Sequence, residues 1–159
     1  MRKKLALVAA TMLVTGTGVI AALSTSSSAS VPSPTTSITV IEHAVSDHVT
    51  DIGKPGDSAG DLLTWHNRVY DDTDASVVGH DQGMCTRISP KKGSWECVWT
   101  TFLADGQITV EGPFYDAADS VVAVTGGTGS YANAAGSMAL HCYTGDDGVG
   151  RCDFAFTLS

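Results

Sequence analysis

The sequence predicts an all-β domain, and three runs of residues in its middle carry this prediction. The runs 95–102, 107–112 and 120–125 are rich in β-branched and aromatic residues and are separated by glycine-containing segments. No apolar period of 3.6 residues connects them, so helices are not expected there. Asp105-Gly106 lies between the first two runs, and this dipeptide is typical of a tight β-hairpin, whose turn needs residues that tolerate positive φ. We therefore expect consecutive antiparallel strands.

The first thirty residues have the pattern of a secretory signal peptide. A basic start, Met1–Lys4, precedes an apolar run over 5–23 and a segment of small residues over 24–30. The alternative is an uncleaved N-terminal anchor, since the run is nearly long enough to span a bilayer. Residues 31–36 form a Pro/Ser/Thr linker. We expect a secreted, extracellular protein whose folded domain is 37–159 and which has no membrane association after signal removal.

The folded domain is expected to contain about eight short strands joined by hairpins. The predicted strands are 37–45, 61–70, 77–88, 94–102, 107–112, 120–125, 136–143 and 151–158, with a long loop over 46–60. Many short strands in a domain of this size predict a closed barrel or a sandwich. The interior of an eight-stranded barrel is either filled by side chains or holds one small ligand.

The charge of the domain excludes some partners. The whole chain has a formal net charge of −8, and the three basic residues of the leader leave the rest with six basic and seventeen acidic residues, or −11. Nucleic acids and anionic membranes need basic patches, so neither is an expected partner.

The four cysteines predict two disulfides. Three pairings are possible in principle, but Cys85 and Cys97 lie almost symmetrically about a turn at 90–93, and Cys142 and Cys152 about a turn at 145–148. Export to an oxidising compartment permits such bridges. A zinc site is the rival interpretation, but C-x-x-C and clustered histidines are both missing from the sequence. We expect no metal and no cofactor.

The sequence supports neither a phosphate-binding loop nor a serine-hydrolase motif. The glycines of 126–129 suggest a phosphate-binding loop, but no helix start and no lysine follow them, so a backbone turn is expected. The G-x-S-x-G elbow of many serine hydrolases is also missing from the sequence.

A polar residue on an apolar strand face is the first candidate for chemistry. Alternation along 61–70 places Leu63, Trp65, Asn67 and Val69 on one face, and Asn67 is the polar exception. Such an asparagine can hold a water or polarise a ligand oxygen. The simpler interpretation is that Asn67 satisfies backbone groups.

Glu42, in the first predicted strand, and the tryptophans Trp65 and Trp99 complete this candidate set. A buried glutamate on an apolar barrel wall has a raised pKa and can act as an acid or a base. If the Glu42 side chain faced solvent instead, it would have no such role.

Several segments together resemble the plant allene oxide cyclases. They are 60–70, 83–86, 106–113 and 123–129, in the same order as in that family. The dirigent proteins, which share the same barrel, have similar Gly-Gly-Thr-Gly and Asp-Gly-Gln signatures. The resemblance implies an eight-stranded antiparallel up-and-down β-barrel and a homotrimer.

The resemblance also assigns residues. It implies that Asn67 is the pocket asparagine, that Trp65 occupies the neighbouring aromatic position and that Cys85 is the pocket cysteine. Glu42 corresponds to the first-strand glutamate. The chain departs from the family at Ala44, where an asparagine is usual, and in having no Ser-Pro pair within 47–60.

The leading hypothesis is a secreted barrel that binds an apolar small molecule and guides its cyclisation or stereoselective coupling. Asn67 and Glu42 are the candidate catalytic residues of this isomerase- or cyclase-like or dirigent-like protein, and Trp65, Trp99 and Cys85 are the candidate substrate-binding residues. Two alternatives are a non-catalytic small-molecule-binding barrel and a secreted, disulfide-stabilised interaction or inhibitor protein. An open pocket at Asn67 would favour the first two hypotheses, and a packed interior the third.

Overall fold

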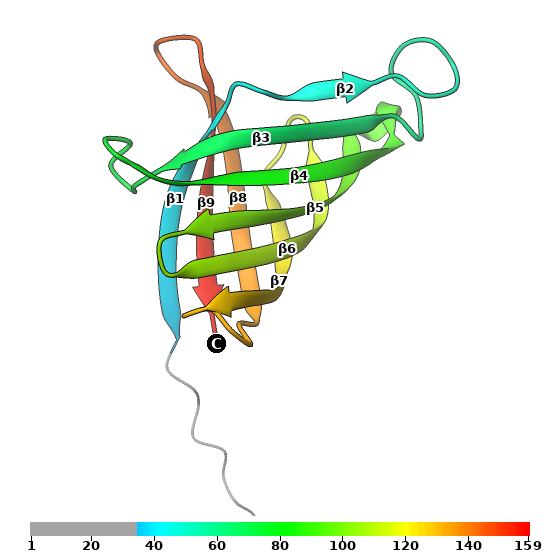
Figure 1. Cartoon of the computed structure of the whole chain (residues 1–159). Coiled ribbons are helices and arrows are strands. Elements are labelled where there is room, and N and C mark those ends of the chain that lie inside the picture. Colours follow the sequence, from blue (N-terminus) through cyan, green and yellow to red (C-terminus); the bar gives the residue numbers. More distant parts are fainter. Residues whose placement is uncertain (1–34) are drawn as a thin grey trace, which may run out of the picture. The chain divides into compact units, whose positions relative to one another are not determined.

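The computed structural model describes residues 35–159 and consists almost entirely of strands (Figure 1). The predicted signal peptide and most of the predicted linker lie outside the described residues. The elements are β1 (Thr36–Ala44), β2 (His48–Thr50), β3 (Leu62–Tyr70), β4 (Val77–Ser89), a 3₁₀ turn (Pro90–Lys92), β5 (Ser94–Leu103), β6 (Gly106–Tyr115), β7 (Ser120–Gly129), β8 (Gly136–Thr144) and β9 (Gly150–Leu158).

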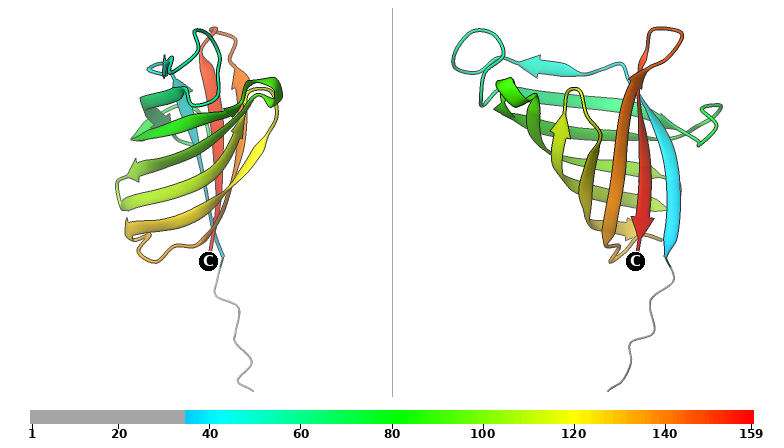
Figure 2. Two further views of the ribbon diagram at one scale, coloured as in Figure 1. Left: turned by 90° about the vertical axis from the view of Figure 1, so that its right-hand side faces the viewer. Right: turned by 180° about the vertical axis from the view of Figure 1, so that it is seen from behind.

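Eight of the strands close into an antiparallel barrel, as the sequence predicted. Strands β3 to β9 each pair with the next, and β1 pairs with β9 along its whole length. The barrel closes where β1 meets β3, with Glu42 opposite Val69. Figure 2 shows the strands wrapping around a common axis from two further sides. The sheet therefore closes on itself within the described domain, which favours the up-and-down barrel over the sandwich.

Two predictions of local structure were wrong. The expected loop over 46–60 contains the short strand β2, which pairs with the start of β3. The glycines of 126–129 do not form the expected turn, because they continue β7 along β6. A Cβ atom at residue 127 would lie 2.6 Å from the carbonyl oxygen of Gln107, so glycine is needed for this close approach. The turn follows at 130–135.

The predicted hairpin between the first two runs is confirmed. Leu103 pairs with Gly106, so Ala104 and Asp105 form the turn. Gly106 has a φ of 147°, a conformation that favours glycine.

Side chains that alternate along the strands fill one half of the barrel interior. Ile108, Met138, Phe156 and Leu158 are buried together there, and Phe156 packs edge-on against Phe154. Burial of these apolar side chains contributes favourably to the free energy of folding. The other half of the barrel interior is less completely filled and contains a cavity.

Both predicted disulfides are present, and each joins residues directly paired on neighbouring strands. Cys85 is bonded to Cys97 across β4 and β5, and Cys142 to Cys152 across β8 and β9. Two such bridges are typical of proteins from oxidising compartments. Within 35–159, none of the helical segments is long and apolar enough to cross a membrane.

Candidate functional site

A cavity of about 60 Å³ lies in the half of the barrel opposite to the apolar filling. Its walls come from the ends of β1, β6 and β8, from the first halves of β3 and β9, from β4 and β5, and from the loop that follows β1. The lining residues are Glu42, Asp47, Leu63, Trp65, Cys85, Cys97, Trp99, Phe114, Leu140, Cys142, Cys152 and Phe154. We call this end of the barrel the mouth. The walls are mainly aromatic and apolar, with two acidic side chains.

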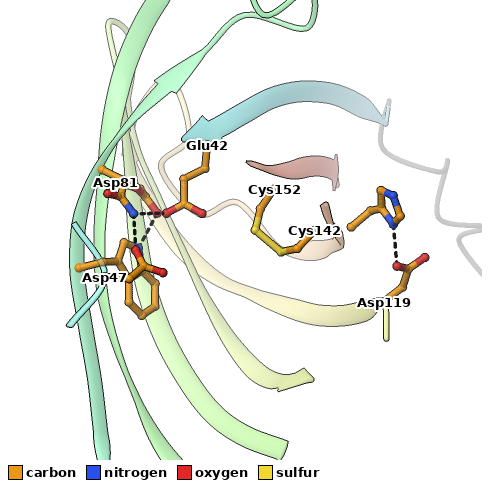
Figure 3. Close-up of a disulfide and its surroundings, with 9 residues drawn as sticks. Glu42, Asp47, Asp81, Asp119, Cys142 and Cys152 are labelled. Carbon is orange, nitrogen blue, oxygen red and sulfur yellow. Dashed lines mark hydrogen bonds and ion pairs between the residues drawn. A yellow bond between two sulfur atoms is a disulfide. The ribbon is translucent and has the colours of Figure 1, made fainter. Parts of the chain in front are cut away.

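Glu42 is the buried acid of the mouth. It lies near the end of β1, opposite Cys152 of β9 and Val69 of β3, and only 6% of its surface is exposed. Figure 3 shows its carboxyl group directed toward Asp81 and Asp47, with the Cys142–Cys152 disulfide close by. The sequence left open whether Glu42 faces solvent or the interior, and in the structure its side chain is buried.

Asn67 connects Glu42 to the loop that follows β1. Its amide Nδ2 donates one hydrogen bond to Glu42 Oε1 and one to Asp47 Oδ1, both at 2.8 Å. Its Oδ1 accepts from the backbone N–H groups of Val45 and Ser46, at 3.1 and 2.9 Å, and from the Ser46 hydroxyl. These five contacts use all the donors of the amide, so Asn67 positions two carboxyl groups and is not itself among the cavity-lining residues.

Asp81 is a second buried acid beside Glu42. It lies on β4 directly opposite Asn67 and is fully buried. The indole N–H of Trp65 donates to its Oδ2 at 2.8 Å, which fixes both the carboxyl group and the tryptophan ring. Its other oxygen, Oδ1, is buried without a hydrogen-bond partner. A buried acceptor of this kind is costly and calls for an explanation.

A proton shared between Glu42 and Asp81 would give the unpartnered oxygen a donor. Burial raises the pKa of Glu42 well above its usual value, and the neighbouring charges of Asp81 and Asp47 raise it further. Burial also raises the pKa of Asp81. Asp81 raises the pKa of Glu42 both by its charge and by a hydrogen bond that favours the protonated form, so the two groups titrate as a pair, and one proton between them would give Asp81 Oδ1 a donor. The pair can both release and accept a proton near neutral pH.

Two tryptophans form the aromatic wall next to this pair. The rings of Trp65 and Trp99 meet edge to face with centroids 6.1 Å apart, and Trp99 also contacts Phe154 at 5.9 Å. Gly83 on β4 makes this possible, since a Cβ atom there would lie 2.6 Å from Cζ2 of Trp65. The Trp99 indole nitrogen is buried without a hydrogen-bond partner. The wall is therefore aromatic, and it includes one buried indole N–H that has no hydrogen-bond partner.

The structure brings most of the predicted site residues together. Glu42, Trp65, Trp99 and Cys85 all line the cavity, and Cys85 does so as half of a disulfide, as expected. Asn67 does not line the cavity, but it donates hydrogen bonds to two residues that do, Glu42 and Asp47.

Asp47 and Asp81 were missed by the sequence reasoning. Asp81 had a usable signal, because it shares its face of the predicted strand 77–88 with Cys85. Asp47 lies in a loop and had none.

Comparison with known proteins identifies the family. The allene oxide cyclase family model matches residues 41–144, about two thirds of the chain. The chain belongs to the allene oxide cyclase family. The match begins at β1 and ends with β8, so it includes both acids of the buried pair and both tryptophans.

Solved structures share the barrel across this family and its relatives. A structure described as a pyocyanin demethylase has 26% identity and a TM-score of 0.64, with 76% of this chain and all of that chain covered. The pterocarpan synthase dirigent protein GePTS1 has 19% identity and a TM-score of 0.66, over 79% of this chain and 87% of that one. AbnU, an exo-specific intermolecular Diels-Alderase, has 16% identity and a TM-score of 0.57, over 79% and 98%. The last two likenesses concern the fold alone.

Proposed function

We propose that this protein is a secreted barrel that binds a small molecule with an apolar body and guides its cyclisation or coupling. The observation that carries the proposal is the buried carboxyl pair of Glu42 and Asp81, placed beside an aromatic cavity. Burying two acids together costs stability, and buried acids with raised pKa values beside a cavity are typical of functional sites. Their burial supports a chemical role.

In the proposed mechanism Glu42 is the acid and base. The protonated carboxyl group donates the proton that it shares with Asp81 to the bound molecule, which leaves both carboxylates of the pair negatively charged. The proton then returns from the product or from water at the mouth. Asn67 holds the Glu42 carboxylate in place through its 2.8 Å hydrogen bond, and the Glu42 carboxylate can stabilise positive charge that develops on the substrate.

Positioning is the second part of the proposed mechanism. The cavity of about 60 Å³ is smaller than the usual pocket for a whole drug-sized ligand, which is roughly 300–1,000 Å³. One end of the molecule would therefore enter the cavity against the wall formed by Trp65 and Trp99, while its body lies across the mouth. Holding a flexible substrate in one conformation and excluding water can supply a large part of a cyclisation barrier.

The names of the similar structures support this class of reaction. A pterocarpan synthase dirigent protein and an intermolecular Diels-Alderase both have this barrel, and both names describe bond formation between or within small molecules. The pyocyanin demethylase is named for a different reaction, a demethylation. We infer that the barrel mouth is the shared place of chemistry.

The test is to identify the ligand and then measure its conversion. Mass spectrometry of material extracted from the native protein should find a small molecule with an apolar body. Purified wild-type protein should convert that molecule or its precursor, Glu42→Gln should lose most of the rate, and Asn67→Leu should lose part of it.

Asp72→Asn, at an exposed acid outside the cavity, is the control with normal activity. If the Glu42→Gln variant turned over the identified substrate like wild type, the mechanism would be wrong. A retained but unconverted ligand would instead support a carrier.

We also propose that copies of this chain assemble as a homotrimer, which the family resemblance implies. The outer face of β3, β4 and β5 has a hollow of about 460 Å³ and exposes the apolar side chains of Met84 and Val98. The side chains around the hollow carry no carboxylate or ammonium group, which suits self-association of an acidic chain. Analytical ultracentrifugation should give a trimer for wild type and a monomer for Met84→Glu. A monomeric wild type would contradict the proposal.

A further inference from the structure

We propose that the cavity at the barrel mouth selects ligands with a compact cationic nitrogen, such as a methylated ammonium group. The inference rests on the proposed function, because it concerns the same cavity, and it specifies the end of the ligand that enters. Three features of the cavity support it: its acceptors, its ring faces and its size.

The acceptors of the mouth have no cationic partner within the cavity. Glu42 and Asp47 both line it, and none of the lining residues of the described domain is a lysine, an arginine or a histidine. The neutral amide of Asn67 donates a hydrogen bond to each of these two carboxyl groups. The described arginines buried or half-buried elsewhere are already paired, Arg87 with Asp57 and Asp116, and Arg151 with Asp74 and Asp147. A positive charge in this cavity must therefore come from a ligand.

One carboxylate oxygen of the acidic cluster is buried and has no hydrogen-bond donor. Asp81 Oδ1 is buried and has no partner, although its sister oxygen is held by Trp65. A proton shared with Glu42 would satisfy it when the pair is protonated. A cation bound against Glu42 favours the ionised form of the pair through its charge, without donating a hydrogen bond to Asp81, which does not line the cavity. Binding of a cation is therefore expected to release a proton.

The ring faces around the cavity suit a compact cation. Four aromatic side chains line it, namely Trp65, Trp99, Phe114 and Phe154. The interplanar angles are 60° for Trp65 and Trp99 and 51° for Trp99 and Phe154, so the rings meet as walls at an angle instead of as a flat stack. Cations are attracted to the faces of aromatic rings, and cages of such rings recognise methylated ammonium groups.

The size of the cavity limits the cation to a compact group. A volume of about 60 Å³ excludes a large ring system but fits one end of a molecule. The side chain of Asp47 is exposed at the mouth, so it can contact a positive charge that is only partly inserted. The body of the ligand then lies outside, where the proposed function places it.

The test compares a cation with its neutral isostere. Choline and 3,3-dimethylbutan-1-ol have the same shape and differ in the charge at one atom. Isothermal titration calorimetry on the full protein should give at least tenfold tighter binding of choline than of the alcohol at pH 8. Titrations in two buffers with different ionisation enthalpies should show proton release for choline and none for the alcohol.

The pH profile and the variants separate this inference from general attraction to an acidic protein. The groups facing the site are Glu42, Asp81 and Asp47, so choline affinity should rise with pH as the Glu42–Asp81 pair loses its proton. Glu42→Gln should remove proton release, and Asp47→Asn should weaken choline severalfold with the alcohol unchanged. Asp72→Asn removes one exposed charge away from the cavity and should change neither.

Each outcome decides one of the two proposals. Equal affinity for choline and the alcohol, or no binding of choline at millimolar concentration, overturns the preference for a cation. Conversion of the identified native substrate by wild type in the same preparation leaves the proposed function intact in that case. Preferential binding of choline together with full turnover by Glu42→Gln would instead retain the cationic ligand and reject the proposed chemistry.

Discussion

The two halves of the barrel interior differ in what fills them. The half around Ile108, Met138, Phe156 and Leu158 is packed with apolar side chains. The mouth contains a cavity, the acids Glu42 and Asp81, and both disulfides. The same eight strands therefore run from a half that stabilises the fold into a half where a cavity and two buried acids lower its stability.

This difference indicates how a small domain stays folded although its functional site lowers the free energy of unfolding. Buried acids and an unfilled cavity each reduce the free energy of unfolding. The packed half and the two covalent bridges offset that loss, and the bridges lie on the walls of the cavity itself. The following predictions test this division from the largest expected effect to the smallest.

Removing a large side chain from the packed half should have the largest effect. Phe156→Ala deletes a ring with 1% exposure and leaves a cavity, so we expect a loss of about 3–5 kcal/mol in the free energy of unfolding. Urea denaturation followed by tryptophan fluorescence measures it. Val121→Ala, at an exposed side chain on the outside of β7, should change stability by less than about 0.5 kcal/mol. Similar losses for both variants would contradict a packed half.

Removing a bridge from the mouth should cost somewhat less. The double substitution Cys142→Ala and Cys152→Ala opens a link between residues ten positions apart, and we expect a loss of about 2–4 kcal/mol. Cys142 is exposed at the mouth and Cys85 is buried, so dithiothreitol should reduce Cys142–Cys152 first. Mass spectrometry after alkylation identifies the reduced pair. Earlier reduction of Cys85–Cys97 would contradict the assigned exposure.

The sequence was sufficient for the fold because the fold depends on local patterns. Alternation placed Trp65, Asn67 and Val69 on one face of β3, and the symmetric spacing of the cysteines gave both bridges. The segment 126–129 was misjudged because its glycines serve a close approach between β6 and β7, which depends on tertiary contacts. The strand β2 was missed because three residues are too few to show a period.

The site was predictable only in part. Glu42, Trp65, Trp99 and Cys85 were found from their strand faces and from the family resemblance. The pairing of Glu42 with Asp81 could not be read from the sequence, because it depends on the closure of β1 onto β3 and on the place of β4 beside them. The loop residue Asp47 reaches the site through Asn67, a contact that no periodicity predicts.

The buried pair should give the mouth a pH dependence that the packed half lacks. The folded-state pKa of Glu42 and of Asp81 is raised above the unfolded value, so this contribution to stability is complete below about pH 4 and is lost as pH rises through the folded pKa, about 6 for Asp81. Between pH 5 and 8 the wild type should lose about 1–3 kcal/mol relative to Glu42→Gln. Urea denaturation at several pH values measures the difference.

The control for this prediction is an acid with the opposite shift. The pKa of Asp61 is lowered, first by hydrogen bonds from the backbone N–H groups of Ile52 and Ser58, so its contribution to stability is present at neutral pH and is lost as pH falls. Asp61→Asn should therefore differ from wild type mainly at neutral pH, and the difference should shrink toward pH 3. A difference between wild type and Glu42→Gln that is constant over pH 5–8 would reject the shared proton.

The smallest expected effect comes from the single hydrogen bond between the aromatic wall and the buried pair. Trp65→Phe keeps a ring in the wall but removes the indole N–H that Asp81 Oδ2 accepts, so we expect a loss of about 1 kcal/mol in stability at neutral pH. Losing this donor also raises the pKa of Asp81, so the pH-dependent loss of stability should move to higher pH. The same urea titrations report both changes. A lower stability with an unmoved pH profile would mean that Trp65 only fills space, and the mouth would then resemble the packed half.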